Sequence, residues 1–331
     1  SDLENAESRL WNKSETSGAD MGRATKGAAQ AMLMKVYMYM HEYAKAKEWG
    51  DKFLQDQAAE YSLAPDFASN FTIAGENNEE SIFEIQYANE ATSDYEPGNG
   101  ATRGTFTQVL TRSRSTNMGD EGWGFNKPTH NLYNEYEEAD SLRRDATIIL
   151  LDSAHLGEQD TYLGTSYLNR KTGLYNADGT GYTYKNAHNT RGVLNNKQYR
   201  LADFYLLYAE ACLGIGDAST ATIYLNKVRT RVGLPTYPGY TFKVNGEEIT
   251  SPTLEEAIRH ERRMELAMEG HRWFDLCRWG VAYEVMTAYM ALESSEAKAE
   301  MQPFKKGVHE LLPIPNKQRQ LNPSLTQNPG Y

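Results

Sequence analysis

The sequence has 331 residues, and its hydrophobic content of 40% can supply the core of one large domain or two ordinary ones. Its formal net charge is −11 and no lysine- or arginine-rich cluster stands out, which argues against a nucleic-acid partner. No run of about 18 apolar residues is present, so the sequence predicts no transmembrane helix.

Three helix pairs, spaced like tetratricopeptide repeats, are predicted along the chain. The first pair comprises residues 22–40 and 42–53. The second comprises residues 199–214 and 217–231, with Asp217 as the N-cap and Gly233 as the stop. The third begins at a capping box formed by Thr253 and Glu256, breaks at Gly270, and continues as one helix over residues 271–292.

Residues 1–12 are predicted to form a helix without a partner. A lone helix leaves Leu3, Leu10 and Trp11 without a neighbouring apolar face, because repeat units bury their hydrophobic sides against one another. We therefore expect the chain to be an N-terminally incomplete portion of a longer protein.

Residues 58–198 have a different character, with many Gly, Asn, Thr and Tyr residues and weak helical periodicity. Within them, residues 81–87 alternate polar and apolar side chains and predict a strand with its apolar side chains inward. One or two short helices are expected within residues 128–149. The predicted organisation is a single domain: helical repeats at about 1–57, 199–231 and 253–292, a loop-rich lobe at about 58–198, and an extended C-terminal tail at 303–331.

The aromatic residues of this lobe are the clearest binding signal. They stand among Asn, Asp, Arg and Gly, and flat apolar rings with polar neighbours suit the C–H patches and hydroxyls of a sugar. Trp123 is the favoured contact, because glycines on both sides leave its ring little steric cover. The predicted ligand-binding residues are Trp123, Tyr95, Asn99, Arg103 and Phe125.

Catalytic and metal chemistry find little support in the sequence. The seven histidines include no metal-binding pair, no nucleophile motif is present, and residues 176–181 are better explained as a polar turn than as a calcium loop. Cys212 and Cys277 are expected to be small apolar side chains in helices. No catalytic residue, metal or cofactor is predicted.

Residues 258–280 combine an apolar helical stripe with a row of carboxylates, Glu261, Glu265 and Glu269, called the carboxylate row below. We expect ion pairing with a structural purpose, and the arginines of the same segment, at 262, 263, 272 and 278, are the expected partners. The segment resembles the signature of the SusD/RagB family. The matching residues are Ile258, Glu261, Arg262, Glu265, Leu266, Glu269, Gly270, Arg272, Asp275, Leu276, Arg278 and Trp279.

The C-terminus carries a second resemblance to this family. Residues 311–315 read Leu-Leu-Pro-Ile-Pro, and residues 322–323 and 327–331 read Asn-Pro and Gln-Asn-Pro-Gly-Tyr. The resemblance implies a mainly α fold, a tetratricopeptide-like helical scaffold with a loop-rich lobe containing a few short strands. The three helix pairs would then be the second to fourth of four repeats.

The function that the resemblance implies is capture of a nutrient, usually an oligosaccharide, by a lipoprotein on the outer membrane of Bacteroidetes. The ligand would pass to a SusC-like TonB-dependent transporter, and a cysteine upstream of this chain would carry the lipid. Two alternatives remain. One is a tetratricopeptide adaptor that binds a peptide in its concave groove. The other is a glycoside hydrolase, for which Asp94, Glu96, Asp120 and Glu121 supply unpaired carboxylates in the loops.

Overall fold

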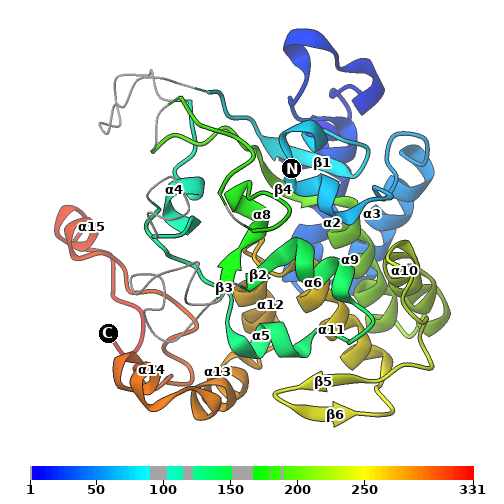
Figure 1. Ribbon diagram of the computed structural model, residues 1–331. Coiled ribbons are helices and arrows are strands. Elements are labelled where there is room, and N and C mark those ends of the chain that lie inside the picture. The colour runs from blue at the N-terminus through cyan, green and yellow to red at the C-terminus, as the bar shows by residue number, and fades with distance from the viewer. Residues whose placement is uncertain (1, 90–102, 115–121, 151–166, 180, 188–189) are drawn as a thin grey trace. The chain divides into compact units, whose positions relative to one another are not determined.

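The computed structural model describes residues 2–89, 103–114, 122–150, 167–179, 181–187 and 190–331. The chain divides into two compact units, Ser1–Glu269 and Gly270–Tyr331. Helices dominate both units, and the strands are short (Figure 1). The helices of the first unit are α1 (Asp2–Glu7), α2 (Lys26–Tyr39), α3 (Tyr43–Asp56), α4 (Thr107–Thr111), α5 (His130–Glu135), α6 (Ser141–Thr147), α8 (Arg170–Gly173), α9 (Leu201–Gly214), α10 (Ala218–Arg231) and α11 (Leu254–Leu266). Its strands are β1 (Ser81–Ile85), β2 (Ile148–Leu150), β3 (Tyr167–Asn169), β4 (Asn196–Arg200), β5 (Phe242–Val244) and β6 (Glu247–Ile249).

Paired helices form the scaffold of the first unit. Helix α2 packs against α3, α9 packs against α10, and α9 also contacts α3 and α11. The strands form three separate two-stranded antiparallel sheets, β1–β4, β2–β3 and β5–β6. The predicted fold class is confirmed: a mainly α scaffold of tetratricopeptide-like pairs with a loop-rich lobe that contains a few short strands.

Local side-chain chemistry fixes where these helices begin and end. The hydroxyl of Thr25 accepts a hydrogen bond from the backbone N–H of Ala28 at the start of α2, and the Asp217 carboxylate caps α10 in the same way. Thr253 and Glu256 form the predicted capping box of α11. After α10, Gly233 adopts a positive φ of 73°, a conformation that glycine enters without a steric penalty.

The core lies between α2, α3, α9, α10 and α11. Its centre is aromatic: the rings of Phe53 and Phe204 lie 4.2 Å apart, and Phe204 stacks on Tyr208. The helices approach closely at Gly50, where an added Cβ atom would lie 2.3 Å from the Tyr208 ring. Glycine at this position therefore sets the distance between α3 and α9. None of the helices in the described part of the chain combines the length and apolar character needed to traverse a bilayer.

The N-terminal segment packs only partly. Helix α1 contacts α2, and Leu3 and Leu10 are half-buried, whereas 56% of Trp11 is exposed. The predicted helix over residues 1–12 is thus shorter, because it ends at Glu7.

Strand β1 departs from the predicted alternation of side chains. Glu84 is buried and Ile85 is 41% exposed, the reverse of an apolar-inward strand. The pairing with β4 contains register shifts on both sides of Phe83. Lys197 of β4 pairs with the Glu84 carboxylate, and Asn195 donates a 3.0 Å hydrogen bond to it. The buried carboxylate is therefore satisfied by its partner strand.

In the carboxylate row, Glu261 and Glu265 are buried and Glu269 is half-buried. All three form ion pairs, as predicted, but most of their contacts come from other elements. Arg143 of α6 contacts both Glu261 and Glu265, and Arg200 at the end of β4 contacts both Glu265 and Glu269. From α10, Arg229 pairs with Glu261 and Arg231 with Glu265; Lys171 of α8 pairs with Glu269. Within the same segment, the expected partners contact other carboxylates: Arg262 with Asp203, Arg263 with Glu135 and Arg278 with Asp275.

This ionic cluster joins the helical scaffold to the loop-rich lobe, because α6 and α8 belong to the lobe and α10 and α11 to the scaffold. Burial alone would raise the pKa of Glu265, but Arg231, Arg200 and Arg143 hold it well below its usual range. Glu265 therefore remains ionised inside the protein.

The second unit contains α12 (Arg272–Arg278), α13 (Ala282–Leu292), α14 (Ser295–Glu300) and α15 (Asn316–Leu321). The single helix predicted over residues 271–292 is wrong: Gly280, at φ 69°, separates α12 from α13. The two C-terminal motifs contact each other, because the Gln327 amide exchanges two hydrogen bonds with the backbone of Ile314 and Asn328 donates to the carbonyl of Leu312. The tail also includes the short helix α15.

Candidate functional site

The Trp123 loop is held by the end of a short helix. The backbone N–H groups of residues 122–125 donate hydrogen bonds of 2.7 to 3.0 Å to carbonyls of residues 109–113. These acceptors include the last carbonyls of α4, which have no partner within the helix itself. An added Cβ atom at Gly122 would lie 2.2 Å from the Arg112 carbonyl oxygen, and Gly124 has a φ of 68°. Both glycines are thus required for this path of the chain.

This path exposes Trp123 and Phe125 beside the half-buried Phe106, and we call these three rings the aromatic cluster. The Trp123 ring lies 5.9 Å from Phe106 and 6.3 Å from Phe125, both in edge-to-face geometry. Trp123 is 44% and Phe125 58% exposed. When a ligand covers large apolar rings that were in contact with water, the free energy of the complex is lowered.

Charged groups lie beside and beneath the aromatic cluster. The guanidinium of Arg191 lies over the Phe106 ring, 4.6 Å from its centre. Arg112, which follows α4, is buried and stacks 3.9 Å from the centre of the Tyr182 ring. Its Nε donates to the carbonyl of Gly173 at 3.0 Å. The buried Arg112 therefore links the segment that carries the cluster to Gly173 and Tyr182.

The structure places some of the predicted ligand-binding residues together and does not describe others. Trp123 and Phe125 lie together in the aromatic cluster. Arg103 is exposed and precedes Phe106 in the chain, and its carbonyl accepts a hydrogen bond from Ala88. Tyr95 and Asn99 lie outside the described residues.

Several other lobe aromatics pack inside the protein. Tyr175 and Tyr167 are buried; the Tyr175 hydroxyl accepts a 3.0 Å hydrogen bond from the backbone N–H of Ser113, and the Tyr167 hydroxyl contacts His130. Their aromatic character alone gave no way to separate these anchors from exposed rings. Arg191 was missed altogether, because it reaches Phe106 only through the antiparallel bridge between Thr105 and Gly192.

The described residues show no cluster suited to a metal ion. Among them, no group of three or more His, Cys, Asp or Glu side chains is placed to hold a metal ion. Cys212 is buried and Cys277 half-buried, and both are free thiols. The loop carboxylates Asp94, Glu96, Asp120 and Glu121 lie outside the described residues.

The chain combines a paired-helix scaffold with a loop-rich lobe that exposes aromatic rings, and comparison with known proteins identifies its family. The SusD family model matches residues 151–331, more than half of the chain. The chain belongs to the SusD family.

Named relatives agree with this assignment. A SusD-like protein of Bacteroides ovatus is 29% identical over 293 residues, which cover 81% of this chain and 48% of that protein. SusD-like protein P25 of Formosa agariphila is 26% identical over 348 residues, which cover 94% of this chain and 60% of that protein. The chain thus spans only about half to three-fifths of the length of these relatives.

Solved structures show the same fold. A laminarin binding SusD-like protein is 31% identical with a TM-score of 0.73, over 100% of this chain and 67% of that one. Surface glycan-binding protein A from Bacteroides thetaiotaomicron, solved in complex with laminarihexaose, is 25% identical with a TM-score of 0.75, over 98% of this chain and 68% of that one.

Proposed function

We propose that this chain binds an oligosaccharide through the aromatic cluster and breaks no bond in it. The observation that carries the proposal is the exposure of Trp123 and Phe125 on a backbone that glycines and helix carbonyls hold in place. A rigid aromatic surface stacks on the C–H face of a pyranose ring without first losing conformational freedom.

Arg103 is exposed, precedes Phe106 in the chain and supplies hydrogen-bond donors for sugar hydroxyls, whereas the buried Arg191 holds the Phe106 ring from below. Tyr95 and Asn99 complete the proposed set of ligand residues. Two solved structures that resemble this chain are a laminarin binding protein and a glycan-binding protein in complex with laminarihexaose, which makes a β-glucan oligosaccharide the first probe to test.

The proposed setting is the cell surface. By its family, the whole protein would be anchored to the outer membrane by a lipid and would deliver the captured glycan to a SusC-like TonB-dependent transporter. Co-purification of the full-length protein with the transporter encoded beside it would test the partnership separately from ligand binding.

The decisive experiment compares two exposed tryptophans. Laminarihexaose and a panel of other oligosaccharides are titrated into wild type, Trp123→Ala and Trp11→Ala by calorimetry. Loss of the Trp123 ring is expected to cost about 1 to 3 kcal/mol of binding, about tenfold to a hundredfold in Kd, with little change in Tm. Trp11 lies in the N-terminal segment, so Trp11→Ala is expected to bind like wild type.

Unchanged affinity with a lowered Tm in Trp123→Ala would show that this ring only packs. The same panel, incubated with the protein and analysed for shorter products, separates a binding protein from a glycoside hydrolase. Product formation that depends on the protein would contradict the proposal.

A further inference from the structure

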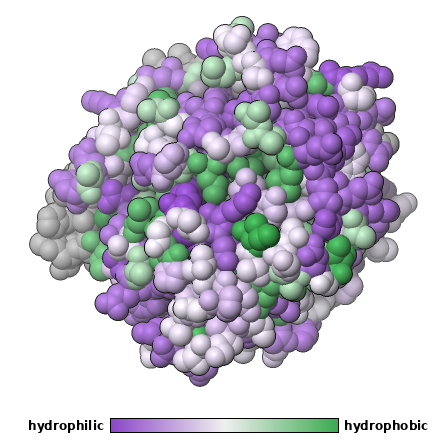
Figure 2. Space-filling view, turned by 90° about the vertical axis from the view of Figure 1, so that its right-hand side faces the viewer, coloured by the Kyte–Doolittle hydropathy of each residue, from purple (hydrophilic) through white to green (hydrophobic). Residues whose placement is uncertain are grey.

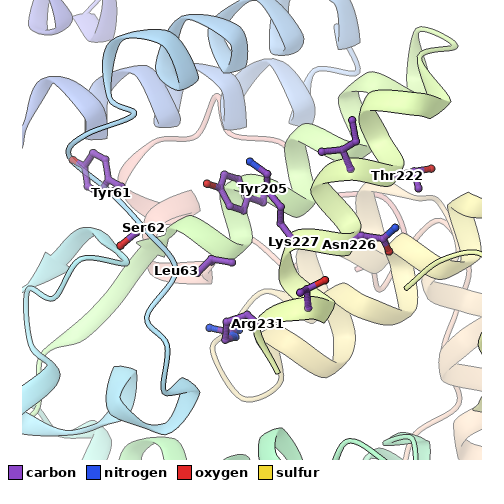
Figure 3. Close-up of a pocket in the computed structure, with 10 residues that line it drawn as sticks. Tyr61, Ser62, Leu63, Tyr205, Thr222, Asn226, Lys227 and Arg231 are labelled. Atoms are coloured by element: carbon purple, nitrogen blue, oxygen red, sulfur yellow. The ribbon is translucent and has the colours of Figure 1, made fainter. Parts of the chain in front are cut away.

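A pocket lies on the helical scaffold, away from the segments that form the aromatic cluster. Its volume is about 690 Å³, and it is lined by the extended segment 61–63 on one side and by α9 and α10 on the other (Figure 3). Its lining residues are Tyr61, Ser62, Leu63, Tyr205, Thr222, Ile223, Asn226, Lys227, Thr230 and Arg231. Figure 2 shows the side of the molecule on which α10 lies, where small apolar patches are separated by hydrophilic side chains.

The aromatic faces of this pocket are already occupied. The Tyr61 ring stacks on Phe53 at 5.4 Å and is covered by the Lys13 ammonium at 4.9 Å. The Tyr205 ring contacts the edge of Tyr224 and lies under the Lys227 ammonium. Both rings are thus engaged by other side chains, and this distinguishes the pocket from the aromatic cluster.

The apolar surface that remains is aliphatic. Leu63 is half-buried, and Ile223 is 53% exposed. An aliphatic side chain of a ligand that packed against Leu63 and Ile223 would remove these two side chains from water. Hydroxyl groups surround this surface: burial raises the pKa of Tyr205 to about 12, so its phenol stays protonated, and Ser62 and Thr230 are exposed.

The charge of the pocket is positive, although the chain as a whole carries −11. Arg231 is neutralised by Glu80 and Glu265. Lys227, by contrast, contacts only the rings of Tyr205 and Tyr224 among the described residues and has no carboxylate partner there. No Asp or Glu lines the pocket. A ligand with a carboxylate would complete this ion pair.

We propose that this pocket docks an extended, acidic peptide segment of a partner protein. An aliphatic side chain of that segment enters the space lined by Leu63 and Ile223, and a neighbouring carboxylate pairs with Lys227. The Tyr205, Ser62 and Thr230 hydroxyls are placed to bond the peptide backbone. The charge complementarity and the aliphatic wall favour a peptide over a saccharide.

The test is an array of heptapeptides whose central residue is leucine or serine and whose two flanking residues are aspartate, asparagine or lysine. Fluorescently labelled wild type is expected to bind the leucine peptides with aspartate flanks best. Lys227→Glu is expected to weaken binding of the best peptide at least tenfold, measured by fluorescence polarisation. Ile223→Ser is expected to weaken it several-fold.

Lys243→Glu is the matched control, because Lys243 is an exposed residue of β5 and its substitution changes the net charge equally. It is expected to bind like wild type. An array without preference for the leucine–aspartate peptides overturns the proposal, as does equal weakening by Lys243→Glu. If laminarihexaose competed with the peptide, the pocket would be part of the glycan-binding site. If the protein self-associated and Lys227→Glu abolished this, the occupant would be a second copy of the chain. Either result would also overturn the proposal of an acidic peptide.

Discussion

Replacing Glu265 by alanine tests whether the ionic cluster holds the scaffold and the lobe together. The Glu265 carboxylate is fully buried and contacts the guanidinium groups of Arg143, Arg200 and Arg231. Removal of one partner from a buried ion pair typically costs about 3 to 5 kcal/mol, because the remaining charge has lost its solvation. Each of the three arginines here keeps another carboxylate, such as Glu80 for Arg200 and Arg231. We therefore expect the lower end of that range, about 3 kcal/mol of unfolding free energy.

The assay is urea unfolding followed by circular dichroism, with Glu255→Ala as the control. Glu255 lies on the same helix but pairs with Arg259 at the surface, where its side chain is 58% exposed. Such a pair contributes about 0.5 kcal/mol or less. If Glu265→Ala lost less than about 1 kcal/mol more than this control, the claim that the cluster is a major source of stability would be refuted.

Two further predictions concern pH and the Trp123 loop. Burial alone would raise the pKa of Glu137, but His260, 3.6 Å from its Oε1, and Arg229 lower it from 4.5 to about 2. A carboxylate with a lowered pKa in the folded state stabilises the protein above pH 4.5 and loses that contribution as the pH falls toward 2. Unfolding free energy should therefore fall across this interval, and less steeply in Glu137→Gln; parallel curves for the two proteins would contradict this. Gly122→Ala should lower stability by about 1 to 3 kcal/mol and weaken oligosaccharide binding together, since the new methyl group meets the Arg112 carbonyl oxygen. Thermal melts and calorimetry check both effects, and a variant with wild-type Tm would show that the loop relaxes freely.

Local signals in the sequence were sufficient for the helical scaffold. The caps at Asp217 and Thr253 and the stop at Gly233 are short-range features, so they could be read without knowledge of the fold. Three local signals were overlooked: the Thr25 cap, which starts α2 at Lys26 and not at residue 22; Gly280, which ends α12; and Asn245–Gly246, whose positive φ angles form the turn of the β5–β6 hairpin.

The sequence by itself determined the family, the paired helices, the ion-paired carboxylate row and the glycine-flanked Trp123, because each depends on spacing along one segment. Only the tertiary structure decided the partners of that row, since Arg143, Arg200 and Arg229 are distant in sequence and meet α11 only when the lobe packs on the scaffold. It also decided which rings are exposed, because burial depends on what covers a residue from elsewhere in the chain. The same reason explains Lys227: a surface lysine becomes distinctive only when segment 61–63 closes a pocket beside it.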